Sequence, residues 1–300
     1  MIGNMNVKGF YFFEVGNEEG TRDLAIAERH ENMVVNTGLD ALATSGNLFY
    51  QCAVGTDNSV VLPTQTALGA QVGITGTILR TTSGAVSVSS TRSYKYLRVT
   101  FRFNKGVATG SLNEVAVFSP GSPNKMLSRS LIVDTLGNPT TLTVLSDEWL
   151  DVTYELQFHV DLTPVVFTAT IAEEVYNITC KPARHLNAVG HNNYTNSILL
   201  NNGTSSTAYN GANGTVEGLP TGSSSSGTLS TGTYVNGSYE ADIMFSGTLD
   251  QLNLTGGIKS LLINLSKTSW QFEFDKPLLK DSYRTVVFTF KLVWGRGDGT

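Results

Sequence analysis

The sequence predicts an all-β protein, built of antiparallel β-sandwich domains with long polar loops and at most one or two short helices. Three observations predict this class: polar and apolar residues alternate over long stretches, helical periodicity is scarce, and charged residues are few. Alternation with a period of two is the pattern of a strand with one buried face. Only 15% of the 300 residues are charged, and serine, threonine, asparagine and glycine take their place.

The clearest predicted strand is Tyr94–Lys105, in which four apolar residues share one face: Leu97, Val99, Phe101 and Phe103. A second strand follows Trp149 and reaches Val160, and a third covers 284–294 near the end of the chain. The segment Phe10–Val15 is apolar on both faces, as expected for a central strand that is covered on both sides.

The best helical segment is short and lies at about Thr37–Thr44, with Asn36 as the expected N-cap because its side chain can accept a backbone hydrogen bond. The two cysteines, Cys52 and Cys180, lie far apart and alternate with apolar neighbours. We therefore predict two buried thiols that act as small hydrophobic residues, and not a disulfide.

The chain is predicted to form two domains, 1–160 and 161–300, because the long strand ends near Val160 and Pro164 would interrupt a ladder. The last strand, 284–294, is a candidate to return to the first domain. Residues 187–236 consist largely of asparagine, glycine, serine and threonine. Such a segment buries little apolar surface, so we expect long surface loops, of which Asn202–Tyr234 could be shortened without loss of the fold.

Catalytic and metal-binding patterns are missing from the sequence, which predicts neither an enzyme nor a cofactor or metal site. His30 begins a zincin-like pattern, but the second histidine that this pattern requires is Val34. The four histidines show no ligand spacing: His30, His159, His185 and His191. The alternative is that His185 and His191 share a site through folding. We expect His159, on the polar face of its strand, to be exposed.

The net charge of −5 disfavours direct nucleic-acid binding, which requires a basic surface to displace counterions from phosphates. No run of about 20 apolar residues is present, so no membrane span is expected. The N-terminal residues lack the charged region and apolar stretch of a secretory signal, which predicts synthesis in a cytoplasm.

Several segments together resemble the virion structural proteins of tailed bacteriophages. The resemblance covers residues 1 to about 160 and 270–296, and is carried by six segments: Asn32–Leu42, Cys52–Thr56 with Pro63–Leu68, Leu112–Phe118, Met126–Ser130, Phe274–Lys280 and Val293–Arg296. Asp57 stands where glycine is usual in that pattern. The resemblance implies a tail-associated structural protein of the tail tip, baseplate, collar or fibre attachment. The host cytoplasm would be its place of synthesis, the virion its location, and other virion proteins and copies of itself its partners.

The same segments also have a physical interpretation that does not depend on the family. Gly38 and Gly55 would permit turns that are closed to residues with a Cβ. Glu114 lies among apolar residues and requires a partner if it is buried, and Arg129 is the candidate. Trp294 would give a large buried face to a sheet.

The predicted assembly interface is the outward face of the strand Tyr94–Lys105, formed by Tyr94, Tyr96, Arg98 and Arg102. Tyrosine and arginine are enriched at the centres of protein interfaces. We expect these side chains to contribute nothing to the core, so that changing Tyr96 and Arg98 would impair assembly alone. A solvated strand face is the alternative. The second functional hypothesis is a receptor- or glycan-binding module at a tail-fibre tip, with the loops of 187–236 as its host-binding edge.

Overall fold

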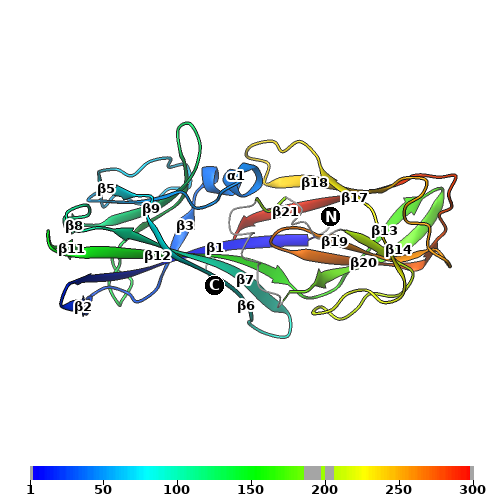
Figure 1. The fold of residues 1–300 in the computed structure, drawn as a ribbon, viewed down its shortest axis with the longest axis horizontal. Helices are drawn as coiled ribbons and strands as arrows, with labels where there is room; N and C mark the ends of the chain where they lie inside the picture. The colour runs from blue at the N-terminus through cyan, green and yellow to red at the C-terminus, as the bar shows by residue number, and fades with distance from the viewer. Residues whose placement is uncertain (1–2, 186–196, 200–205, 298–300) are drawn as a thin grey trace.

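The computed structural model describes residues 3–185, 197–199 and 206–297. Within these residues the protein is almost entirely β, with one short helix, α1 (Asn36–Thr44), which confirms the predicted fold class. The molecule is elongated, and β1 (Gly3–Asn17) follows its long axis through the middle (Figure 1).

The described strands form three sheets. The largest has thirteen strands, namely β1 with β2 (Gly20–Arg22), β3 (His30–Val34), β4 (Gln51–Gly55), β5 (Gln71–Thr75), β6 (Ile78–Ser87), β7 (Arg92–Phe103), β9 (Glu114–Ser119), β10 (Lys125–Leu131), β12 (Trp149–Asp161), β17 (Thr228–Thr231), β18 (Glu240–Gly247) and β21 (Val286–Arg296). The second has six: β13 (Val165–Ile171), β14 (Glu174–Ala183), β15 (Thr207–Tyr209), β16 (Ser224–Ser226), β19 (Ile258–Asn264) and β20 (Ser269–Leu278). The third is the pair β8 (Gly110–Leu112) and β11 (Leu142–Val144).

Strand β1 joins the two ends of the molecule because different strands pair with successive parts of it. One edge pairs with β12 from Met5 to Gly16, and the other pairs in turn with β21, β3 and β2. The pairing with β21 joins Gly3–Val7 to Leu292–Arg296 and is parallel, whereas the other pairs of this sheet are antiparallel. The C-terminal strand thus lies beside the N-terminal strand, which is the contact that a return to the first domain requires.

The large sheet curls into a half-barrel whose inner face is apolar. The apolar face of β7 is fully buried inside it, at Leu97, Val99, Phe101 and Phe103. The far edge strand β5 comes back towards β7, since Thr75 Oγ1 donates to the carbonyl oxygen of Arg102 at 2.9 Å. This curl arises from the right-handed twist of successive strands and leaves the opposite side of β7 on the outside of the molecule.

The second half of the molecule is a sandwich, in which β20 of the six-stranded sheet packs against β21. The rings of Phe272 and Phe290 stack with centroids 4.5 Å apart, and Phe274 lies 5.8 Å from Phe288. The buried apolar cluster is continuous across residue 160, from the curled sheet into this sandwich. The division into domains 1–160 and 161–300 therefore stays a prediction.

The helix lies where it was predicted, but Asn36 is not its N-cap residue. Asn36 is the first residue of α1, Val35 occupies the cap position, and no side chain caps the helix. The amide oxygen of Asn36 instead accepts a hydrogen bond from Arg296. Gly38 lies within the helix and not in a turn, and a Cβ there would be 2.0 Å from the carbonyl oxygen of Leu127. Its role is close packing of α1 on β10.

Three short strands, β15, β16 and β17, interrupt the loops expected in 187–236, whereas most of the other described residues of this range lie outside strands. β15 lies between β16 and β19, and Ala208 is fully buried. Polar side chains hold the following turn to the sheet: the amide N–H of Gly214 donates to Gln271 Oε1 at 2.8 Å. Deleting Asn202–Tyr234 would therefore remove sheet structure. Residues 187–196 and 200–205 lie outside the described part of the chain.

Both cysteines are buried thiols outside any disulfide, as predicted. Burial raises the pKa of the Cys52 thiol well above its ordinary value and that of Cys180 to about 12.

The β13–β14 hairpin contains a strained turn. Its two central residues, Ala172 and Glu173, have positive φ of 49° and 69°, which residues with a Cβ rarely adopt. Asparagine and glycine are the residues that favour this two-residue turn. Changing Ala172→Asn and Glu173→Gly together is therefore expected to raise the free energy of unfolding by about 1 kcal/mol. Urea denaturation measures the change. Substituting Ala85→Asn on β6, where φ is negative, is the control, and an equal gain there would contradict the interpretation.

Candidate functional site

The four residues of the predicted interface lie on the outward face of β7, where β6 and β12 flank them. The register places Arg102 opposite Asp151, Arg98 opposite Glu155, and Tyr94 opposite His159. On the next strand, β1 places Phe10 opposite Glu155. The site is therefore a four-stranded sheet surface, and not a single row of side chains.

Arg98 forms an ion pair that supports the fold. Its Nε lies 2.9 Å from Glu155 Oε2, and Arg29 approaches the other carboxylate oxygen at 3.5 Å. Glu155 is only 3% exposed, whereas the side chain of Arg98 is 41% exposed. Removal of Arg98 would weaken the compensation of a buried carboxylate, which argues against the expectation that Arg98 contributes nothing to the core.

Arg102 is arranged in the same way at the next position along the face. Its guanidinium binds both oxygens of the buried Asp151, at 2.6 and 2.7 Å, and lies 4.2 Å from the ring centroid of Trp149. The bidentate pair raises the pKa of Arg102. Arg98 similarly lies over the rings of Phe12 and Tyr96. Both arginines are thus fixed in orientation, each with part of its guanidinium at the surface.

The two tyrosines are half-buried and, unlike the arginines, take part in no ion pair. Tyr96 lies flat over Gly84 of β6, where a Cβ would be 2.6 Å from the ring. Tyr94 packs on the ring of His159 at 4.8 Å and beside Tyr96 at 6.4 Å. His159 is half-buried, which corrects the expectation of an exposed side chain. Burial, with Lys8, Arg29 and Arg92 nearby, lowers its pKa to about 4.

Two hollows lie on this side of the sheet. One, of about 330 Å³, is lined in part by Phe12, Glu14, Arg80 and Arg98. The other, of about 480 Å³, is lined by residues of β1 together with Arg92, His159 and Asp161. An uneven surface with ordered arginines and tyrosines could accept side chains of a protein partner.

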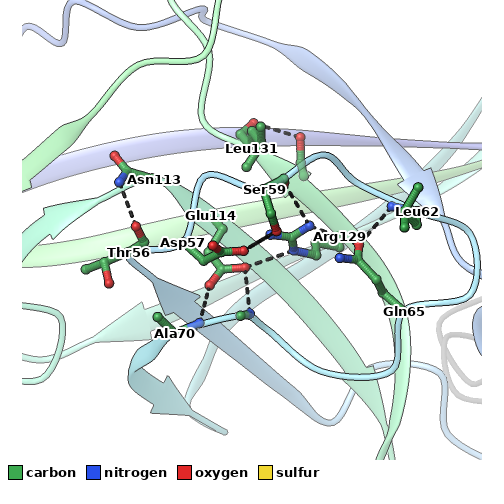
Figure 2. Close-up of polar contacts among 12 residues, drawn as sticks. Thr56, Asp57, Ser59, Leu62, Gln65, Ala70, Asn113, Glu114, Arg129 and Leu131 are labelled. Atoms are coloured by element: carbon green, nitrogen blue, oxygen red, sulfur yellow. Dashed lines mark hydrogen bonds and ion pairs between the residues drawn. The ribbon is translucent and has the colours of Figure 1, made fainter.

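A second cluster brings together three of the segments that carry the phage resemblance: Pro63–Leu68, Leu112–Phe118 and Met126–Ser130. Arg129 is fully buried and donates from Nε to Glu114 Oε2 at 2.8 Å, so the predicted partnership is confirmed. Its other nitrogens reach Asp57 at 3.0 Å and Gln65 at 2.9 Å, as Figure 2 shows. Glu114 in turn accepts the backbone N–H of Ala70 at 2.9 Å. One guanidinium thus holds residues 57–70 against β9 and β10.

Two further segments, Cys52–Thr56 and Val293–Arg296, extend this arrangement towards α1. A Cβ at Gly55 would lie 2.5 Å from Glu114 Oε1, so close approach, and not a turn, requires glycine there. Trp294 is buried, as predicted, and its indole N–H donates to the carbonyl oxygen of Leu39 at 3.0 Å. Arg296 binds the carbonyl oxygen of Val34 and the side chain of Asn36. These contacts join the end of the chain to the helix.

The histidines are dispersed through the described residues. His30 is buried and stacks on Phe13, His159 lies on β12, and His185 contacts the carbonyl oxygen of Val216 at 2.8 Å. His191, and therefore a site that it would share with His185, lies outside the described residues. Within the described part of the chain, no group of three or more histidine, cysteine, aspartate or glutamate side chains is placed to hold a metal ion. No described helix is long and apolar enough to cross a bilayer.

Sequence reasoning missed the acidic residues of β12 that fix the arginines. The alternation after Trp149 places Asp151 and Glu155 on the polar face of a strand, but their burial depends on arginines from other segments. Both strands alternate with a period of two, and on the polar face one strand carries acids at 151 and 155 and the other carries arginines at 98 and 102. This equal spacing of opposite charges is the signal that could have predicted the ion pairs. No family model, curated protein or solved structure matches this chain.

Proposed function

We propose that this chain is a structural component of a tailed-bacteriophage particle, associated with the tail at the tip, baseplate, collar or fibre attachment. It acts through contacts with other virion proteins and with copies of itself, and not as an enzyme. The observation that carries the proposal is the convergence of segments that resemble phage virion proteins. Glu114 and Arg129 form a buried ion pair, and the guanidinium of Arg129 also binds the partly exposed Asp57 and Gln65. Trp294 and Arg296 bind the α1 region.

This convergence supports the proposal because short matches that arise by chance have no reason to meet in space. Arg129 and Glu114 contact each other, and Gly55 is required beside Glu114. All of these roles are structural, since each residue positions backbone or compensates a buried charge. The resemblance therefore concerns a common framework, whereas interaction surfaces such as the face of β7 can differ between proteins that share it.

Location in the particle tests the proposal. Antibody against this chain should label the tail of intact particles produced from the genome that encodes it, and mass spectrometry should detect the chain in purified particles. A protein found only in the lysate, and not in particles, would refute the assignment. Label at a free fibre tip, together with binding of the purified protein to host glycans, would favour the receptor-binding hypothesis instead.

The outward face of β7 is expected to form one of the contacts. Substituting Tyr94→Ser and Tyr96→Ser removes two surface rings and leaves the ion pairs of Arg98 and Arg102 intact. The free energy of unfolding should fall by about 1 kcal/mol or less, because both side chains lie at the surface. Incorporation of the chain into particles, measured by mass spectrometry, should fall severalfold.

The matched control is Tyr283→Ser, which removes a tyrosine that is 89% exposed and lies far from β7 in the sequence. It should leave incorporation unchanged. Normal incorporation of the folded double variant would show that this face is solvated in the particle.

A further inference from the structure

Strand β13 forms an edge of the six-stranded sheet that no other described strand covers. It pairs with β14 on one side only, and the sheet order places it at the end. Its seven residues, VVFTATI, contain no charge and no proline, and the register with β14 has no shift. An edge of this kind offers unpaired backbone N–H and C=O groups to another strand.

The other edge strands of the described residues each have a feature that discourages pairing. β6 contains Arg80, and its pairing with β7 has a register shift beside that residue. The pairing of β5 with β4 also contains a register shift. β2, β8, β11 and β16 have three residues each, and β17 has four. Short strands, charges and bulges are the usual protections of a sheet edge. β13 is long for an edge and has none of them.

The side chains of β13 also leave apolar surface uncovered. Phe167, Ala169 and Ile171 pack against the core but are only partly buried. Val165 and Val166 are 57% and 65% exposed. A strand added beside β13 would extend the sheet and cover the row that β13 now leaves half-exposed.

We propose that the occupant is a second copy of this chain, with the two β13 strands paired antiparallel about a twofold axis at Thr168. This register places Phe167 opposite Ala169, a large side chain opposite a small one, on both sides of the axis. It also places Val165 opposite Ile171 and Val166 opposite Thr170, so like faces meet. No charged residue lies in the strand, so the pairing brings no like charges together.

The predicted contact is isologous and modest in size. Seven residues give a ladder of ~23 Å, which is enough for a concentration-dependent dimer and allows other surfaces to bind further subunits. β13 lies towards the end of the molecule opposite β2, β8 and β11, so a neighbour can approach it (Figure 1). The inference does not rest on the phage assignment, because it concerns the purified chain alone.

Sedimentation velocity over a wide concentration range tests the proposal on the purified protein. The wild-type chain should show a reversible monomer–dimer equilibrium. Thr168→Lys would place two lysines opposite each other at the axis, and should abolish the dimer while circular dichroism stays unchanged. Val175→Lys is the matched control: Val175 is 59% exposed and on the same face, but it lies on β14, one strand away from the proposed interface. It should dimerise like the wild type.

A cross-linking experiment locates the contact. Thr168→Cys should be joined to its copy by a short bifunctional thiol reagent, because adjacent strands lie ~4.8 Å apart. Val175→Cys should not, since three strand spacings, ~14 Å or more, would separate the two thiols. Cys52 and Cys180 are buried and give little background. The proposal would be overturned if the wild-type chain stayed monomeric at every concentration, or if Thr168→Lys dimerised as well as the wild type. It would also be overturned if both lysine variants lost the dimer equally, or if a dimer formed without cross-linking at Thr168.

Discussion

Replacing Arg129 with methionine is expected to lower the free energy of unfolding by about 3 to 5 kcal/mol. The guanidinium and the Glu114 carboxylate are both fully buried, with 0% of either side chain exposed. Without Arg129, Glu114 keeps the backbone N–H groups of Gly69 and Ala70 but no opposite charge within its contacts. An uncompensated buried carboxylate is far more costly than the loss of one hydrogen bond.

The substitution also releases the segment 57–70. Asp57 and Gln65 are held to the sheet through the guanidinium of Arg129. We therefore expect hydrogen exchange at the amides of 57–70 to accelerate even in conditions where the variant stays folded. Urea denaturation followed by fluorescence measures the change in stability.

Two comparisons make the Arg129 prediction specific. Lys276→Met removes a cation from an exposed pair with Glu174, and should cost about 1 kcal/mol or less. Combining Arg129→Met with Glu114→Gln removes both buried charges and should recover part of the stability lost in the single variant. A loss below about 1 kcal/mol for Arg129→Met, or no recovery in the double variant, would contradict the role assigned to this pair.

The sequence was sufficient to predict where one strand face is buried, because period-two alternation is a local signal. β7 shows this clearly: Leu97 and Phe101 are fully buried, and Arg98 and Arg102 point outwards. The short helix was found for the same reason, since its apolar spacing is contained within nine residues. Burial of the Glu114–Arg129 pair could be anticipated because an acid among apolar residues requires a partner.

The sequence did not predict the surroundings of a side chain where segments far apart in the chain determine them. β12 looks half-polar, but Asp151 and Glu155 are buried because arginines from β7 and from position 29 cover them. Asn36 has the type of side chain that caps a helix, but Arg296 at the end of the chain occupies its oxygen. β15 looks like a loop because it has only three residues, and its backbone pairing with β19 depends on a segment about 50 residues further along the chain.

The second large effect is expected from acid. His30 is buried to 6% exposure and stacks on Phe13 with centroids 5.1 Å apart. Burial disfavours the charged imidazolium and lowers the pKa of His30 from 6.5 to about 4. Below pH 6.5 the unfolded chain therefore binds a proton that the folded protein does not bind until about pH 4.

The sign of the pH dependence follows from this difference. The stability associated with neutral His30 is fully present above pH 6.5 and is lost progressively as the pH falls towards 4. A difference of 2.5 pH units (6.5 − 4) corresponds to about 3 kcal/mol at the acid end of this window. His159, whose pKa is lowered in the same direction, adds to the loss.

His30→Phe retains a flat ring against Phe13 and cannot take up a proton. We expect its free energy of unfolding to fall less steeply than that of the wild type between pH 6.5 and 4, measured by urea denaturation at closely spaced pH values. His159 and the carboxylates titrate in both proteins, so the difference between the two curves isolates His30. Parallel curves across this window would show that His30 can be charged in the folded protein without cost, and its burial against Phe13 would then not control the acid stability of the curled sheet.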